Sequence, residues 1–133
     1  MDHISQKERS ALMSKIKGKN TTPEIKIRLY LWGKGLRYRL HRKNLPGTPD
    51  ITFPSQNKVI FVHGCFWHGH KCRKSKLPKT RTDFWKEKIM RNKKRDTANR
   101  RALKKLGVES FVIWECQVEH EKALKRLMSF LAD

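Results

Sequence analysis

The pattern of hydrophobic and polar positions predicts a small protein in which helices and strands are mixed. The stretch Thr21-Thr22-Pro23-Glu24 has three features of a helix start: a hydroxyl residue that can cap, a proline and an acid in the first turn. Ile25, Leu29 and Trp32 then recur at helical spacing and give this helix one apolar face. Gly33 and Gly35 are expected to end it.

Four later stretches have the pattern of strands. Leu36–Leu40 alternates apolar and polar residues, as a half-buried strand does. Asp50–Phe53 follows the turn-rich segment Leu45–Pro49 and predicts a short strand. Lys58–Val62 is apolar and β-branched, which suits a central strand, and Glu109–Trp114 predicts another strand.

Two further helices complete the predicted order. Thr82 is expected to cap a long helix that ends near Leu106-Gly107, and the last helix carries Leu124, Leu127 and Leu131 on one face. Helix, strands, long helix, strand and helix in that order predict a mixed α/β sheet with helices on its faces. The 133 residues suffice for one compact domain, which we place at residues 21–133.

Residues 1–20 are expected to form a separate basic arm. Ser5–Glu8 resembles a capping box, so a short helix could run to Ile16, but its apolar content is thin. Two interpretations stay open: the arm orders on DNA as a clamp, or it is a solvated chain terminus.

The charge of the chain points to nucleic acid as the partner. The sequence has 32 Lys plus Arg against 12 Asp plus Glu, a formal net charge of +20. An anionic membrane is an alternative partner, and a basic disordered tail is disfavoured because the charge is interleaved with apolar residues throughout. No run approaches the ~18–20 apolar residues of a membrane span, and the N-terminus has no apolar signal core. We therefore expect a cytoplasmic protein.

A dense cluster of cysteines and histidines predicts a structural zinc site. Cys65, His68, His70 and Cys72 lie close together in the sequence, and Cys116 follows a later strand. Three cysteines and one histidine would complete the four N or S ligands of structural zinc. An odd number of cysteines in a reducing compartment argues against a disulfide framework, so the alternative is three unrelated thiols. Spacing does not choose between His68 and His70.

Asp50 is a candidate ligand of a catalytic metal. An acidic residue that opens a strand, followed by a second buried strand, is the layout of many metal-dependent nucleases with the restriction-endonuclease-like fold. Those enzymes usually carry Glu-x-Lys or Asp-x-Lys on the second strand, where this chain reads Phe61-Val62-His63. The usual motif is therefore broken, and a lone Asp after a Pro-Gly turn is more often a turn or cap residue.

The long helix places a carboxylate on its inward stripe. One face is formed by residues three and four positions apart: Trp85, Ile89, Asn92, Asp96, Asn99, Leu103 and Leu106. An inward carboxylate is costly unless it is paired or hydrogen-bonded. Asp96 therefore either meets a cation or histidine at a functional site, with His63 and His68 the available partners, or satisfies buried backbone groups.

Phe66 and Trp67 stand next to each other within the Cys/His loop. Two large aromatic residues in a loop cannot both easily face a core, and beside so much basic charge they could stack on bases or wedge into a base step. The alternative is that one of them packs under the loop.

Taken together, these motifs closely resemble those of the Vsr mismatch endonucleases. The similarity covers nearly the whole chain in the same order, and it is carried by Leu45–Asp50, Phe61–Cys72, Leu77–Trp85, Lys88-Ile89, Arg95-Asp96 and Val112–Cys116. It implies a restriction-endonuclease-like core with a structural Zn²⁺ and a catalytic Mg²⁺. The implied zinc ligands are Cys65, His70, Cys72 and Cys116. The implied magnesium ligands are the carboxylate of Asp50 and the backbone carbonyl of Val62, where the family commonly has Thr.

The resemblance also implies the roles of the remaining site residues. His68, oriented by Glu24, matches the base that activates the attacking water. His63 and Asp96 match groups that support the phosphate and the metal-bound waters. A His-based centre of this kind would explain the missing Glu-x-Lys.

The implied reaction is a magnesium-dependent nick in one strand next to the T of a T:G mismatch, which initiates very-short-patch repair. Phe66, Trp67 and Trp85 match residues that intercalate beside the mismatch from the major groove, and Met13 matches one that inserts from the minor groove. Gly69 replaces a histidine of some members, which we expect to matter little. We expect a monomeric bacterial enzyme of the cytoplasm and nucleoid, with double-stranded DNA as substrate and other mismatch-repair factors as candidate partners.

Overall fold

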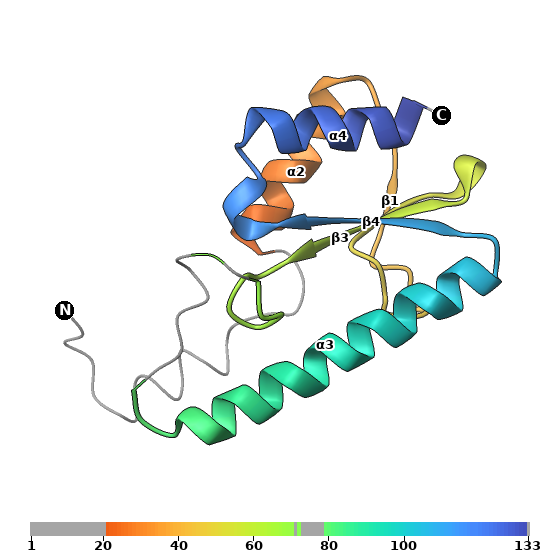
Figure 1. The fold of residues 1–133 in the computed structure, drawn as a ribbon. Coiled ribbons are helices and arrows are strands. Elements are labelled where there is room, and N and C mark those ends of the chain that lie inside the picture. Colours follow the sequence, from red (N-terminus) through yellow and green to blue (C-terminus); the bar gives the residue numbers. More distant parts are fainter. Residues whose placement is uncertain (1–20, 71, 73–78, 133) are drawn as a thin grey trace.

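The computed structural model describes residues 21–70, 72 and 79–132 (Figure 1). The described elements in chain order are α2 (Thr22–Gly33), β1 (Arg39–Leu40), β2 (Ile51–Phe53), β3 (Lys58–His63), α3 (Thr82–Lys105), β4 (Glu109–Trp114) and α4 (Glu121–Ala132). Short 3₁₀ turns follow β2 and β4, at Pro54–Gln56 and Glu115–Gln117. The predicted mixed α/β class is confirmed, whereas the predicted N-terminal arm lies outside the described residues.

The four strands form one sheet in the order β1-β2-β3-β4. β1 and β3 both pair antiparallel with β2, and β3 pairs parallel with β4. A parallel pair needs a long crossover connection, and α3 supplies it. The register sets His63 opposite Trp114 at the carboxyl ends of β3 and β4. The segments that follow these two residues therefore leave the same edge of the sheet side by side.

Helices cover both faces of the sheet. In Figure 1, α2 and α4 lie on one face and α3 crosses the other. Ile27 and Leu127 pack with Ile60 in the larger core between the sheet and α2 and α4, while Val59 and Phe61 pack with Leu103 in a smaller core under α3. β3 is thus covered on both sides, which explains why its sequence is a continuous apolar run and confirms it as a central strand.

The apolar face predicted for α2 is not its packed face. Ile25, Leu29 and Trp32 are 41%, 67% and 51% exposed, whereas Ile27 and Leu31 are fully buried. Both sets have helical spacing, so the sequence pattern could not decide between them, and the sheet selects the second. The helix start was predicted correctly, since the Thr21 side chain accepts a hydrogen bond from the Glu24 amide.

The strand predicted at Leu36–Leu40 is shortened to Arg39–Leu40, and both residues are exposed. The register places Arg39 opposite Thr52, so the pairing could continue only to Phe53 before Pro54 begins a 3₁₀ turn. Proline has no amide hydrogen to donate, and the ladder ends there.

The two ends predicted for α3 are each shifted by one residue. Arg81 occupies the cap position with a φ of 55°, and Thr82 is the first helical residue, whose hydroxyl donates to the Lys79 carbonyl. Leu106 follows the last helical residue and is 62% exposed, so it lies outside the buried stripe. Among the described residues, no helix combines the length and apolar character needed to cross a membrane.

Candidate active site

A cleft of about 660 Å³ brings together five of the predicted site residues, including Val62 of β3. Asp50 precedes β2, His63 ends β3, His68 lies in the loop after β3, and Asp96 lies on α3. The cleft opens where the carboxyl end of β3 faces α3, the edge at which α/β sheets commonly bind their ligands.

Asp96 holds His68. The distance from His68 Nδ1 to Asp96 Oδ2 is 2.5 Å, and because a carboxylate can only accept, His68 donates from Nδ1. The inward carboxylate predicted on α3 therefore has a histidine partner. This bond leaves Nε2 of His68 as the ring nitrogen that can accept a proton.

His63 stacks on His68 as a neutral ring. The ring centroids are 3.8 Å apart with an interplanar angle of 4°. The pKa of His63 is lowered to about 4, mainly by burial and then by the nearby His68, against the opposing effect of Asp96. Nδ1 of His63 is buried and has no hydrogen-bond partner in the described part of the chain. The ring thus offers a neutral polar atom beside the proposed base.

Asp50 is fixed by the neighbouring strand. The backbone amide of Val62 donates to Asp50 Oδ2 at 2.7 Å. The pKa of Asp50 is raised to about 8, mainly by burial and then by a hydrogen bond with Glu24, while the Val62 amide and Arg28 act in the opposite direction. Without a bound metal ion, Asp50 therefore favours its protonated form at neutral pH.

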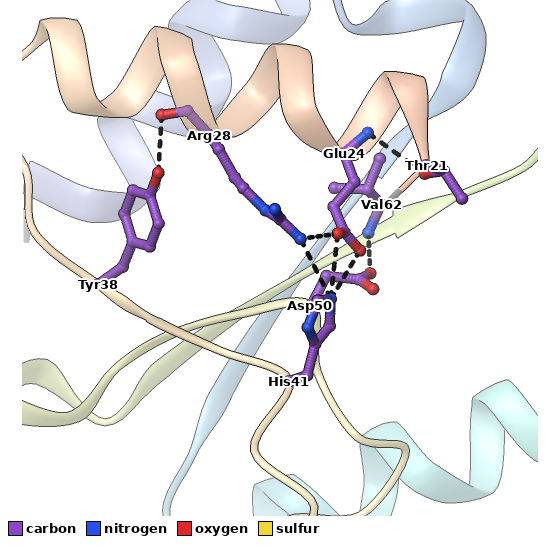
Figure 2. Close-up of polar contacts among 7 residues, drawn as sticks. All are labelled: Thr21, Glu24, Arg28, Tyr38, His41, Asp50 and Val62. Atoms are coloured by element: carbon purple, nitrogen blue, oxygen red, sulfur yellow. Dashed lines mark hydrogen bonds and ion pairs between the residues drawn. The ribbon is translucent and has the colours of Figure 1, made fainter. Parts of the chain in front are cut away.

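Glu24 lies with Asp50 and His41, while Asp96 supplies the carboxylate that bonds to His68, so a role of Glu24 in orienting His68 stays a prediction. Figure 2 shows the buried Glu24 carboxyl between Arg28 and His41, close to Asp50. Arg28 pairs with Glu24, and His41 Nε2 lies 3.0 and 3.1 Å from its two oxygens. This arrangement follows from placement, because α2 approaches Asp50 whereas Asp96 reaches His68 from α3.

The sequence analysis missed Arg28 and His41. Arg28 is four residues after Glu24 on α2, a spacing at which opposite charges pair on a helix, and this signal was available. His41 follows a strand pattern and has no motif around it, so only the fold reveals it. The cleft also contains basic side chains that suit a phosphate, contributed by Lys43, Arg95 and Arg100.

A second cluster of metal-ligating side chains adjoins the cleft. The four residues Cys65, His70, Cys72 and Cys116 each offer a ligand atom, and these atoms all lie within 4.8 Å of one another. His68 is not in this group, because it is engaged with Asp96. The pKa of Cys65 is raised to about 12, mainly by burial; a hydrogen bond with the Cys116 backbone lowers it, and the adjacent thiols contribute to the rise. The strand register accounts for the cluster, since Cys65 and Cys116 each follow a paired strand end by two residues.

Trp114 connects the two clusters. Its ring stacks on His70 with centroids 4.3 Å apart and meets His63 edge-on at 5.2 Å. The sequence analysis placed Trp114 only at the end of a strand. Its ring therefore contacts both a predicted zinc ligand and a predicted catalytic histidine.

The three predicted intercalating residues contact one another. Phe66 lies 5.1 Å from Trp67 and 5.5 Å from Trp85, and the two tryptophan rings are 5.9 Å apart, all edge-on. Lys88 lies above Trp67 at 5.3 Å. The aromatic cluster is half-buried, so Phe66 and Trp67 pack against Trp85 instead of under the loop. Met13 lies outside the described residues.

Known proteins similar to this chain are DNA endonucleases and nicking enzymes. Residues 1–74 match the family described as DNA mismatch endonuclease Vsr. The chain is 47% identical over 132 residues to the type II nicking enzyme V.XorIIP of Xanthomonas oryzae, covering 99% of this chain and 97% of the relative. It is 41% identical to the type II nicking enzyme V.NmeAIP of Neisseria meningitidis, with the same coverage. It is 40% identical to the DNA mismatch endonuclease Vsr of Escherichia coli, covering 87% of this chain and 74% of the relative.

Proposed function

Because the chain belongs to the Vsr family of DNA mismatch endonucleases, we propose that it nicks one DNA strand next to the T of a T:G mismatch and so initiates very-short-patch repair. The reaction is magnesium-dependent hydrolysis of a phosphodiester. The observation that carries the proposal is the convergence of Asp50, His63, His68 and Asp96 in one cleft with basic side chains. A non-catalytic nucleic-acid-binding protein would not need this convergence.

The residues around Asp50 fit a magnesium ion. Two carboxyl groups, Asp50 and Glu24, lie together, and Arg28 and His41 already engage Glu24. A divalent cation would replace the proton that Asp50 otherwise retains. The Asp50 carboxylate, with the backbone carbonyl of Val62 in the same cleft, supplies the oxygen ligands that magnesium prefers. When bound, magnesium supplies positive charge to the phosphate and orients water.

The histidines perform the proton transfer in this proposal. His68 takes the proton of the attacking water at Nε2, because Asp96 holds Nδ1 in its protonated form. His63 stays neutral and supports the phosphate or a bound water through its unpartnered Nδ1. Arg95 and Arg100 neutralise the phosphate from α3. Glu24 acts on Asp50, holding the metal-ligating carboxyl in place.

The thiol cluster fits a structural zinc. Three sulfurs and one imidazole nitrogen match a tetrahedral N/S ligand set, and a bound zinc would stabilise the thiolates that crowding disfavours. The four ligands Cys65, His70, Cys72 and Cys116 would then fix the loop that carries His68. The domain would then consist of a restriction-endonuclease-like core to which the zinc-bound loop is attached.

Recognition of the mismatch is assigned to two groups of residues. Phe66, Trp67 and Trp85 form a wedge that opens the base stack beside the mismatch, where the wobble pair makes unstacking easier. Residues 1–20 form a basic arm ahead of the domain at residues 21–133, and Met13 inserts from the opposite groove.

A second candidate is a nick at a different lesion or site. It is favoured by the two relatives named as type II nicking enzymes, which cover nearly the whole chain. The same cleft would serve both reactions, and the difference would lie in the residues that contact the bases.

The test is a nicking assay with magnesium on matched duplexes that differ at one base pair. We expect the T:G duplex to be nicked in the T strand and the T:A duplex to remain intact. A panel of other mismatches, and undamaged DNA, separates the two candidates. Equal nicking of T:G and T:A would refute mismatch specificity, and undiminished nicking by Asp50→Ala would refute the assigned metal site.

A further inference from the structure

A second groove runs along α3 and joins the catalytic cleft. It measures about 860 Å³ and lies between α3 and β4, with Phe130 of α4 also in its lining. Both cavities share His63, His68, Asp96 and Arg100, but Asp50 lines only the first. The groove is therefore a continuation of the cleft that leads away from the predicted magnesium ligand.

One wall of this groove is basic. It carries four cations of α3, namely Lys93, Arg100, Arg101 and Lys104. Within the described part of the chain none of the four forms an ion pair, although Arg100 donates to the Ser110 hydroxyl. The lining contains two acids, Glu109 and Asp96, and Asp96 is already bonded to His68. The cations thus remain available for phosphates.

The rest of the lining is largely apolar and aromatic, and it includes Val108, Phe111, Val112, Trp114 and Phe130. Val108 and Val112 lie on the α3 side of the sheet, and the two phenylalanines lie at the edge strand β4 on the α4 side. The rings of Phe111 and Phe130 lie 5.3 Å apart. Cations that follow a backbone, beside aromatic rings on which bases can stack, are the features of single-stranded nucleic acid sites. In a duplex the bases are paired and stacked, so such a lining could not reach them.

We propose that this groove binds a few unpaired nucleotides of the substrate strand next to the scissile phosphate. The inference rests on the proposed function. Because the cleft and the groove share lining residues, a DNA strand bound at His68 would continue directly into the groove. The volume lies within the roughly 300–1,000 Å³ of small-ligand clefts, which suits a short single strand. The complementarity of charge and the continuity with the catalytic cleft together identify the occupant.

The test compares two double variants of α3 that remove the same charge. Arg101→Ala with Lys104→Ala removes two groove cations, and Lys94→Ala with Lys105→Ala removes two exposed cations of the same helix that do not line the groove. Binding of a labelled oligothymidylate is followed by fluorescence anisotropy over a range of salt. We expect the groove variant to bind at least tenfold more weakly than its control, with a log–log salt slope smaller by about 1.4. Equal affinities of the two variants overturn the proposal.

A third variant tests the aromatic part of the lining. Phe130→Leu keeps an apolar side chain but removes the ring, and we expect about fivefold or greater loss of oligothymidylate affinity with an unchanged salt slope. Unchanged affinity of Phe130→Leu contradicts the stacking role. Nicking of a T:G duplex by the parent protein is measured in parallel. Nicking with no groove-dependent oligonucleotide binding overturns this inference alone, whereas groove-dependent binding without nicking overturns the proposed function alone.

Discussion

Replacing Gly69 should disturb the protein far more than its position outside both ligand sets suggests. The sequence comparison led us to expect that this residue matters little. In the structure Gly69 has a φ of +68°, and a Cβ at this position would lie 2.7 Å from Ile89 Cγ2 and 2.9 Å from Lys93 Cδ. The lysine side chain can move aside, but the branched Ile89 is buried and stiff at its first torsion angle. A substitution at Gly69 is therefore predicted to cost more than that expectation implies.

The magnitude follows from two separable terms. A side chain in the left-handed region costs about 1–2 kcal/mol. Overpacking against Ile89 adds about 1–3 kcal/mol. Gly69→Ala should thus lower the free energy of unfolding by roughly 2–5 kcal/mol, the sum of the two terms. Because Gly69 lies between His68 and His70, it should also reduce nicking by displacing the catalytic loop.

Two other glycines provide matched controls for urea unfolding at fixed zinc concentration. Gly107 has a φ of +80° and open space around it. Gly107→Ala should therefore lower the free energy of unfolding only by the torsional ~1–2 kcal/mol. Gly33→Ala has neither problem, and alanine at the end of α2 should change stability by under ~1 kcal/mol. Ile89→Leu removes the clashing methyl and should restore part of the loss when combined with Gly69→Ala. Equal losses at Gly69 and Gly107, or no rescue by Ile89→Leu, would refute the steric argument.

Three further predictions concern the site. The pKa of Asp50 is raised to about 8, so the free energy of unfolding of the metal-free protein should fall as pH rises between about 4 and 8. Calorimetry should show that Mg²⁺ affinity rises toward pH 8 and that Mg²⁺ binding releases a proton. Asp50→Asn should remove both pH dependences. Asp96→Asn should lower kcat by roughly 10²–10⁴-fold through loss of the His68 tautomer while the melting temperature changes little, and an unchanged kcat would contradict that role. Zinc removal should open the loop, so that thiol alkylation proceeds at exposed Cys116 before buried Cys65; equal rates with and without zinc would argue against the assigned cluster.

The sequence predicted those parts of the fold in which one pattern has one solution. Lys58–His63 has to be central because it is apolar on both faces, and the helix start at Thr21 is determined by its local capping chemistry. The packed face of α2 could not be predicted, since Ile27 and Leu31 repeat as regularly as the exposed residues between them. Only the position of the sheet distinguishes the two faces.

The same reasoning explains which site residues were found. Asp96 could be identified because a carboxylate on a buried stripe needs a partner, and the partner is one of the two histidines expected from the sequence. His41 carries no such signal, because its role arises from a turn that brings it to Glu24 across 17 residues. Long-range pairing of this kind is set by the tertiary fold and not by local sequence spacing.

The site is assembled from ionisable groups whose charged forms are disfavoured in the folded protein unless cations are bound. In the absence of a metal, Asp50 retains a proton up to about pH 8 and Cys65 up to about pH 12. Both groups lose hydration on folding, and each lies close to other groups of its own kind. Each bound cation therefore stabilises the folded state in addition to its role in the site. Trp114 lies against both His70 and His63, which joins the thiol cluster to the catalytic rings. Binding at either cluster should therefore strengthen binding at the other, because both ligand sets require the same ordered loop.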